Sequence, residues 1–157
     1  MAGWYFALKF IHVVSSAVLF GTGLGIAFFM WMAHRTGDAR TIAATARSVV
    51  IADAAFTASA VVVQFLTGAA LAAIAGYGWR EPWLAAALAL YVFVGACWLP
   101  VVWIQYHLRD LARKAAATGG ALPPRYHRLF GIWFALGWPA FLGVLAIFAL
   151  MVWKPAL

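Results

Sequence analysis

Charged residues and cysteines are scarce in this sequence, and each shortage excludes a class of protein. Only 10% of the 157 residues are charged and 67% are hydrophobic, whereas about a quarter of an average soluble domain is charged. A soluble fold of this size has too little interior to hide so much apolar surface. The single cysteine, Cys97, excludes an internal disulfide and any CxxC metal or redox motif. The composition therefore predicts a membrane protein of one domain.

Several functional signatures are also missing. The sequence contains no HExxH zinc motif, phosphate-binding loop or nucleophile elbow, so hydrolase and ATPase functions have no support. No basic segment precedes the first apolar run, which we therefore expect to be retained rather than cleaved as a signal peptide. Eleven Lys and Arg oppose four Asp and Glu. Because the basic residues gather in two short connections, membrane topology explains the excess, and no nucleic-acid partner is expected.

Four apolar runs are each long enough for the roughly 20 residues that cross the hydrocarbon of a bilayer. A membrane span must satisfy its own backbone hydrogen bonds, so all four should be helices. The predicted fold is an all-α, four-helix transmembrane bundle, with spans at about residues 4–32, 49–75, 83–105 and 129–152. An aromatic belt is expected at one set of helix ends, formed by Trp4, Tyr5, Tyr77, Trp79, Trp83 and Trp153.

The basic residues predict the orientation. The first and third connections, 34–47 and 109–128, contain eight Lys or Arg, whereas the other side has only Arg80 and Lys154. The excess predicts that both connections are cytoplasmic and that both termini are periplasmic. The expected location is the bacterial cytoplasmic (inner) membrane.

Local signals place the helix ends outside the apolar runs. Gly37 and Asp38 are suited to end the first helix and cap the second. Gly119 is suited to end a third helix that continues past the membrane, and Pro123 and Pro124 to begin the fourth.

Helical spacing gives each of the first three spans one polar or small face, which should look inward because buried polar groups avoid lipid. On the first span, Gly21, Gly23 and Gly25 form a Gly-x-Gly-x-Gly run. Close helix packing is the expected role of these glycines, and a cofactor ring lying on them is the alternative. The polar faces contain Lys9, His12, Ser16, Gly23, Ala27, Met30 and His34; then Asp53, Thr57, Ala60, Gln64, Thr67 and Gly68; then Tyr91, Gly95, Trp98, Val102, Gln105 and Arg109.

His12 is the main candidate for chemistry, because it should lie roughly 12 Å inside the membrane. A histidine there needs a partner. The simpler interpretation is a hydrogen bond to Gln64 or Thr67, and the functional one is an axial ligand to haem iron. Lys9 would then pair with a haem propionate, or it extends to the outer surface. Tyr91 should lie at the depth of His12.

The remaining polar groups leave alternatives open. His34, His107 and His127 should lie near the cytoplasmic helix ends, where they would form a zinc or copper site, or His34 alone would ligate haem. Asp53 is expected to pair with Arg109 or Arg125. Gln64 and Gln105 would bond between helices, or contact a quinone or the haem edge.

The whole chain, across all four spans, resembles a bacterial family of predicted integral membrane proteins of unknown function, DUF2269. The resemblance implies a membrane fold and no assigned activity. It rests on KFIH at 9–12, FGTGLGIAFF at 20–29, ACWLPVVW at 96–103, RDLA at 109–112, PPRY at 123–126 and FALGWPAF at 134–141.

The first span, with Lys9, His12 and His34, is more distantly similar to two other families. One is HemJ, four-span proteins that bind haem and act in protoporphyrinogen oxidation, and the other is the copper-resistance CopD-type domain. HemJ also uses a lysine in a later span, but residues 83–105 contain neither lysine nor histidine.

The sequence hypothesis is thus a haem-b-binding redox module with His12 as iron ligand and Lys9, Gln64, Tyr91 and His34 as further candidates. It would pass electrons to a quinone or a partner protein. The first alternative is a non-enzymatic membrane subunit, small transporter or copper-handling protein, and the second is protoporphyrinogen oxidation. Besides the lipid bilayer, the expected partner is a second copy or a larger membrane complex.

Overall fold

The computed structural model describes residues 2–78 and 81–155, and within them the chain is helical with no strand. Four helical segments are long and apolar enough to span a membrane, which confirms the predicted all-α, four-span fold. The second segment is interrupted by one wider π-helical turn. The elements are α1 (Ala2–Thr36), α2 (Ala39–Ala52), the π turn η1 (Asp53–Thr57), α3 (Ala58–Ile74), α4 (Pro82–Thr118) and α5 (Pro124–Trp153).

The predicted helix-end signals act as expected. Gly37 has a φ of 65° after α1, and the Asp38 carboxylate accepts hydrogen bonds from the Arg40 and Thr41 backbone N–H groups, which caps α2. Gly119 ends α4 with a φ of 65° in the left-handed region that glycine adopts without strain. Pro124 occupies the first turn of α5, where its missing N–H costs no helical hydrogen bond.

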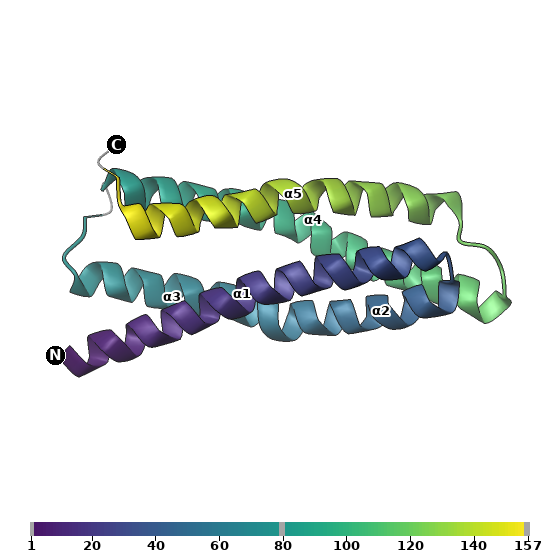
Figure 1. Ribbon diagram of the computed structural model, residues 1–157, viewed down its shortest axis with the longest axis horizontal. Helices are drawn as coiled ribbons and strands as arrows, with labels where there is room; N and C mark the ends of the chain where they lie inside the picture. Colours follow the sequence, from purple (N-terminus) through teal and green to yellow (C-terminus); the bar gives the residue numbers. More distant parts are fainter. Residues whose placement is uncertain (1, 79–80, 156–157) are drawn as a thin grey trace.

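The four long segments run antiparallel, so the connections lie at opposite ends of the bundle (Figure 1). We call the end with both termini and the α3–α4 connection the terminal end, and the opposite end the loop end. Trp4 and Trp153 are exposed at the terminal end, whereas Trp83 is buried against Tyr77, so the belt prediction is wrong for Trp83. The predicted belt residue Trp79 and the predicted outer basic residue Arg80 lie outside the described residues.

Side-chain packing is dense at the loop end, where α1, α2, α4 and α5 share one hydrophobic cluster. The largest fully buried side chains belong to this region: Met30, Ile42, Leu108 and Tyr126. A smaller cluster of Ala72, Trp83 and Leu84 closes the terminal end.

Between the two clusters, the bundle separates into two helix pairs. α1 packs along α3, and α4 packs along α5, while the backbones of α1 and α5 lie farther apart and meet through aromatic side chains such as Phe20 and Phe141 (Figure 1). Two glycines allow close approach within the pairs. A Cβ at Gly68 of α3 would lie 3.1 Å from His12 Cε1, and one at Gly143 of α5 would lie 2.6 Å from Val94 Cγ2. The gap between the pairs holds the candidate site.

Candidate functional site

A cavity of about 380 Å³ occupies the middle of the bundle and is lined by all four long helical segments. Its volume falls in the range of small-molecule sites, roughly 300–1,000 Å³. On α5 its lining extends from Trp133 to Phe148, about 20 Å along the axis at the helical rise per residue. The cavity is therefore elongated and runs parallel to the helices.

The cavity opens sideways between α1 and α5. Three of its lining side chains are also exposed at the outer surface: Leu24 of α1 is 50% exposed, and Phe134 and Trp138 of α5 are 40% and 54% exposed. All three are apolar and lie on membrane-spanning segments. The side of the cavity between α1 and α5 is therefore bordered by apolar side chains that also reach the outer surface.

Most of the lining is apolar, but four of the residues that line it each have a buried polar atom without a hydrogen-bond partner in the described chain. The atoms are Asp53 Oδ2, Thr57 Oγ1, Gln105 Oε1 and Trp133 Nε1. The four residues are only 3–6% exposed. Buried polar groups in native proteins nearly always have a partner, so each exception needs an explanation. Their convergence on one cavity indicates a binding site.

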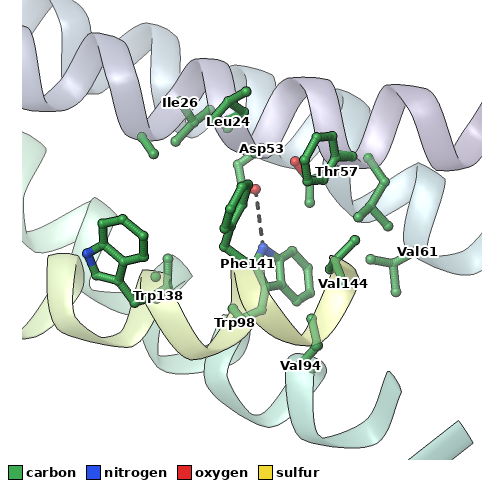
Figure 2. A pocket seen from close by; sticks show the side chains of 18 of the residues that line it. Leu24, Ile26, Asp53, Thr57, Val61, Val94, Trp98, Trp138, Phe141 and Val144 are labelled. Carbon is green, nitrogen blue, oxygen red and sulfur yellow. Dashed lines mark hydrogen bonds between the residues drawn. The ribbon is translucent and has the colours of Figure 1, made fainter. Parts of the chain in front are cut away.

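Asp53 lies at the centre of this arrangement. Its Oδ1 accepts a hydrogen bond from Trp98 Nε1 at 3.2 Å, and the Trp138 and Phe141 rings project from α5 nearby (Figure 2). Trp98 is seven residues from Gln105, where the third predicted span ends, so Asp53 lies about 10 Å inside the membrane. Asp53 also begins the π turn η1, and such turns occur frequently at functional sites.

The predicted ion pair of Asp53 is wrong. Arg109 instead pairs with its neighbour Asp110, with Nη2 2.9 Å from Oδ1, and Arg125 is exposed at the loop end. Arg109 finds an acidic partner on its own helix without entering the membrane, which is the less costly arrangement for a cation. Among the described residues, no cationic side chain lies within ion-pair distance of Asp53.

His12 has a different environment, because its ring nitrogens both face polar partners on α3. Its Nδ1 lies 2.8 Å from Thr67 Oγ1, and its Nε2 lies 3.4 Å from the Gln64 amide nitrogen. The Thr67 hydroxyl donates to the Val63 carbonyl, so it accepts from His12 Nδ1–H, which leaves Nε2 as the acceptor for Gln64. Ser15 donates to the Gln64 side-chain oxygen.

The hydrogen-bonding interpretation of His12 thus describes the geometry, including the predicted partners Gln64 and Thr67. His12 is not among the residues that line the cavity. A haem iron at Nε2 would have to displace the Gln64 amide, and no histidine of the described chain lines the cavity itself. The arrangement around His12 therefore does not fit a haem site as it stands.

The other candidate residues are dispersed. Lys9 is exposed on α1 and does not line the cavity, whereas Gln64 and Tyr91 do. The Tyr91 hydroxyl donates to the Val61 carbonyl at 2.7 Å and thereby joins the two helix pairs. Tyr91 is thus already bonded within the protein.

The histidines of the loop end do not form a trio. The His34 ring stacks on Phe130 with centroids 3.7 Å apart, and His127 lies 5.8 Å away in an edge-on arrangement. His107 instead packs on Trp103 of its own helix. Within residues 2–78 and 81–155, no three His, Cys, Asp or Glu side chains are grouped as metal ligands would be.

The glycine run of α1 is not a packing contact within the chain. A Cβ at Gly21, Gly23 or Gly25 would have no atom within 4 Å, so that prediction is wrong for contacts inside one molecule. Gly23 lines the central cavity, and Gly25 lines a shallower groove between α1 and α2. The glycines remove side chains where the surface is hollowed.

The helical faces predicted most of the site, but not its chemistry. Asp53, Thr57 and Gln105 lie on the predicted polar faces and line the cavity, yet sequence reasoning chose His12 as the centre. Trp133 was missed, because an indole N–H in an aromatic-rich span gives no distinct signal. Only the helix positions reveal which buried atoms lack partners.

Comparison with known proteins identifies a family but no activity or ligand. No curated protein and no solved structure matches the chain, so the distant likeness to HemJ and CopD is not shown. A family described as predicted integral membrane proteins, DUF2269, matches residues 6–155 of the 157. The chain therefore belongs to the DUF2269 family of integral membrane proteins.

Proposed function

We propose that this protein binds an elongated amphipathic molecule, which enters its central cavity from the bilayer. The observation that carries the proposal is that four residues lining a largely apolar cavity each have a buried polar atom without a partner. Leaving such an atom buried without a partner costs about 1–3 kcal/mol. A ligand with hydrogen-bonding groups would remove this cost.

The order of residues along the cavity indicates how such a molecule would lie. Asp53, Gln105 and Trp133 occupy the half towards the loop end, whereas Val61, Val144, Ile147 and Phe148 line the half towards the terminal end. The polar groups of the terminal half, on Ser16, Gln64 and Tyr91, already have partners. The polar part of the ligand would thus face Asp53 and its tail would point towards the terminal end.

Photolabelling in lipid nanodiscs tests the proposal. The probe is hexadecanol with a diazirine in its chain, a neutral single-chain amphiphile, and the labelled residues are identified by mass spectrometry. We expect saturable labelling of the half-buried cavity wall, for example at Val61 and Val94, above the labelling of exposed residues such as Phe10.

Two glycines of α1 provide a matched pair of variants. Gly23→Leu adds a side chain into the cavity, whereas Gly21→Leu adds the same side chain outside it, and both positions have free space at the Cβ. We expect Gly23→Leu to reduce cavity labelling about tenfold, as loss of most ligand contacts would, and Gly21→Leu to leave it unchanged. Equal effects of the two variants, or labelling of exposed residues alone, would contradict the proposal.

The haem-b redox module remains a separate, sequence-based prediction. Its support is the depth of His12 and its position on a polar, glycine-containing helix face. Because the Nε2 of His12 faces the Gln64 amide, the cavity proposal assigns no role to haem. Purified protein expressed with haem supplied would show a Soret band if the haem hypothesis is correct, and the absence of that band would reject it.

The membrane orientation is also part of the proposal. The basic connections at the loop end support a cytoplasmic loop end, periplasmic termini and a location in the bacterial inner membrane. In this orientation, the unpartnered atoms lie in the cytoplasmic half of the membrane. Self-association through Gly25 would leave this cavity in place, since Gly25 lines the separate groove and not the cavity.

A further inference from the structure

The cavity contains one acidic side chain and no basic one. Among the described residues that line it, Asp53 is the only carboxylic acid, and none is Lys, Arg or His. Asp53 is 4% exposed, and its Oδ2 has no partner. An ionised carboxylate inside a membrane needs a positive charge or strong donors to compensate it, and without them the group takes up a proton. Trp98 donates to Oδ1, and the Thr57 hydroxyl is the other donor close to the carboxylate.

We propose that the ligand is a lipophilic cation, whose positive head pairs with Asp53 Oδ2. This inference rests on the proposed function and names the class of molecule that the same cavity takes. A bound cation would compensate the carboxylate, which no basic residue of the cavity wall does. A neutral lipid would leave the charge uncompensated, and an anionic lipid would add repulsion.

Aromatic rings around Asp53 suit the same ligand. Trp98 donates to the carboxylate, and Trp138 and Phe141 of α5 line the same cavity (Figure 2). Aromatic faces attract cations, most strongly in desolvated sites, and they recognise quaternary ammonium groups in particular. The wall therefore offers a negative charge and π faces to one head group.

The space beyond Asp53 suits an alkyl tail. From Phe141 to Phe148 on α5, the cavity continues for about 10 Å towards the terminal end. Its lining there is apolar, including Val144 and Ile147. A single-chain cation would place its head at Asp53 and its chain in this region.

Competition between charged amphiphiles tests the inference. Decyltrimethylammonium, decanol and decanesulfonate share one chain and differ in head charge, and each would compete with the diazirine–hexadecanol probe in nanodiscs. After correction for partition into the bilayer, we expect the cation to displace the probe at about tenfold lower concentration than the alcohol, as a desolvated charge pair implies. The sulfonate should be the weakest competitor.

Asp53→Asn keeps the shape of the side chain and removes its charge. We expect this variant to retain probe labelling but to lose the advantage of the cation, whereas Asp53→Glu should retain it. Asp110→Asn is the control, because Asp110 pairs with Arg109 outside the cavity, and it should behave as wild type. Should Asp53→Asn fail to fold, the three-ligand comparison on the wild-type chain still decides.

The outcomes separate the two proposals. Equal displacement by all three amphiphiles, with normal cavity labelling, would overturn the cation inference and leave the proposed function standing. Cation preference that persists in Asp53→Asn would also overturn it. An absence of cavity labelling in the wild-type protein would instead reject the proposed function.

Discussion

Two sets of buried polar groups in this membrane bundle differ in how completely they are hydrogen bonded. Between α1 and α3, His12, Ser15, Gln64 and Thr67 bond to one another and to the backbone. On the cavity wall, Asp53, Thr57, Gln105 and Trp133 each keep one atom without a partner. The first set holds two helices together, and the second is available to a ligand. A polar side chain at membrane depth is therefore not by itself a sign of function. A buried polar atom without a hydrogen-bond partner is the more informative sign.

Magnitudes support this distinction. A satisfied hydrogen bond between membrane helices contributes about 0.6 kcal/mol on average, which is enough to align helices. Four buried polar atoms without partners cost roughly 4–12 kcal/mol together, at about 1–3 kcal/mol each. This cost is comparable to the entire net stability of a typical domain, about 5–15 kcal/mol. A protein that carries such a cost is expected to offset it in a bound state.

Replacing His12 should have the largest effect on the hydrogen-bond network between α1 and α3. His12→Ala removes the ring that joins Thr67 to Gln64 and leaves a void against Gly68. We expect a loss of about 3 kcal/mol in the free energy of unfolding, measured by thermal or denaturant unfolding in detergent. Photolabelling of the cavity should persist below the new unfolding temperature. Loss of cavity labelling with unchanged stability would contradict this structural role and would indicate that His12 takes part in ligand binding.

The same substitution, Gln to Leu, can be made once in each set of buried polar groups. Gln64→Leu removes the acceptor of the Ser15 hydroxyl and the donor to His12, and should cost about 1–2 kcal/mol of stability. Gln105→Leu removes an amide oxygen without a partner, and should leave the stability of the empty protein unchanged or raise it. Parallel unfolding curves check both, and a greater destabilisation by Gln105→Leu would reverse the assignment.

Asp38 is exposed to water and belongs to neither set of buried polar groups. Replacing it should have the smallest effect on stability of the changes considered. The hydrogen bond from the Thr41 side chain holds the pKa of Asp38, the cap of α2, below its ordinary value of 3.8. A lowered pKa means that the cap stabilises the fold above the unfolded-state pKa and loses this effect as the pH falls through the folded-state pKa.

The check is the unfolding temperature of wild type, Asp38→Asn and Asp38→Ala between about pH 6 and pH 2. Asp38→Ala should be slightly less stable than wild type near pH 6 and converge with it in acid. Asp38→Asn, which caps without titrating, should show no such convergence with Asp38→Ala. A wild-type curve parallel to that of Asp38→Ala throughout would contradict the role of the cap.

Hydropathy and capping rules predicted the fold well, because run length and end signals are local properties. Helical spacing also placed His12 at the level of Thr67 and Gln64, since two antiparallel helices fix which residues share a depth. Spacing did not predict the gap between α1 and α5, which depends on how all the helices pack. For this reason the glycine run was misassigned to packing.

The π turn and the state of Asp53 were also beyond the sequence. No residue in Asp53–Thr57 signals an extra residue in the turn, and Asp53 was assigned a basic partner because Arg109 lay on an inward face. The structure gives Arg109 a closer carboxylate in Asp110. Which polar atoms stay unpaired is decided by side-chain geometry, and this property distinguishes the candidate site from the structural network.

One paired measurement tests the central distinction most directly. Thr57 and Thr67 lie on the same helical segment and are 6% and 7% exposed, but only Thr67 has hydrogen-bond partners. We predict that Thr67→Val lowers the free energy of unfolding by about 1–2 kcal/mol, whereas Thr57→Val leaves it unchanged or raises it. Equal destabilisation by the two substitutions, or a larger loss for Thr57→Val, would contradict the account.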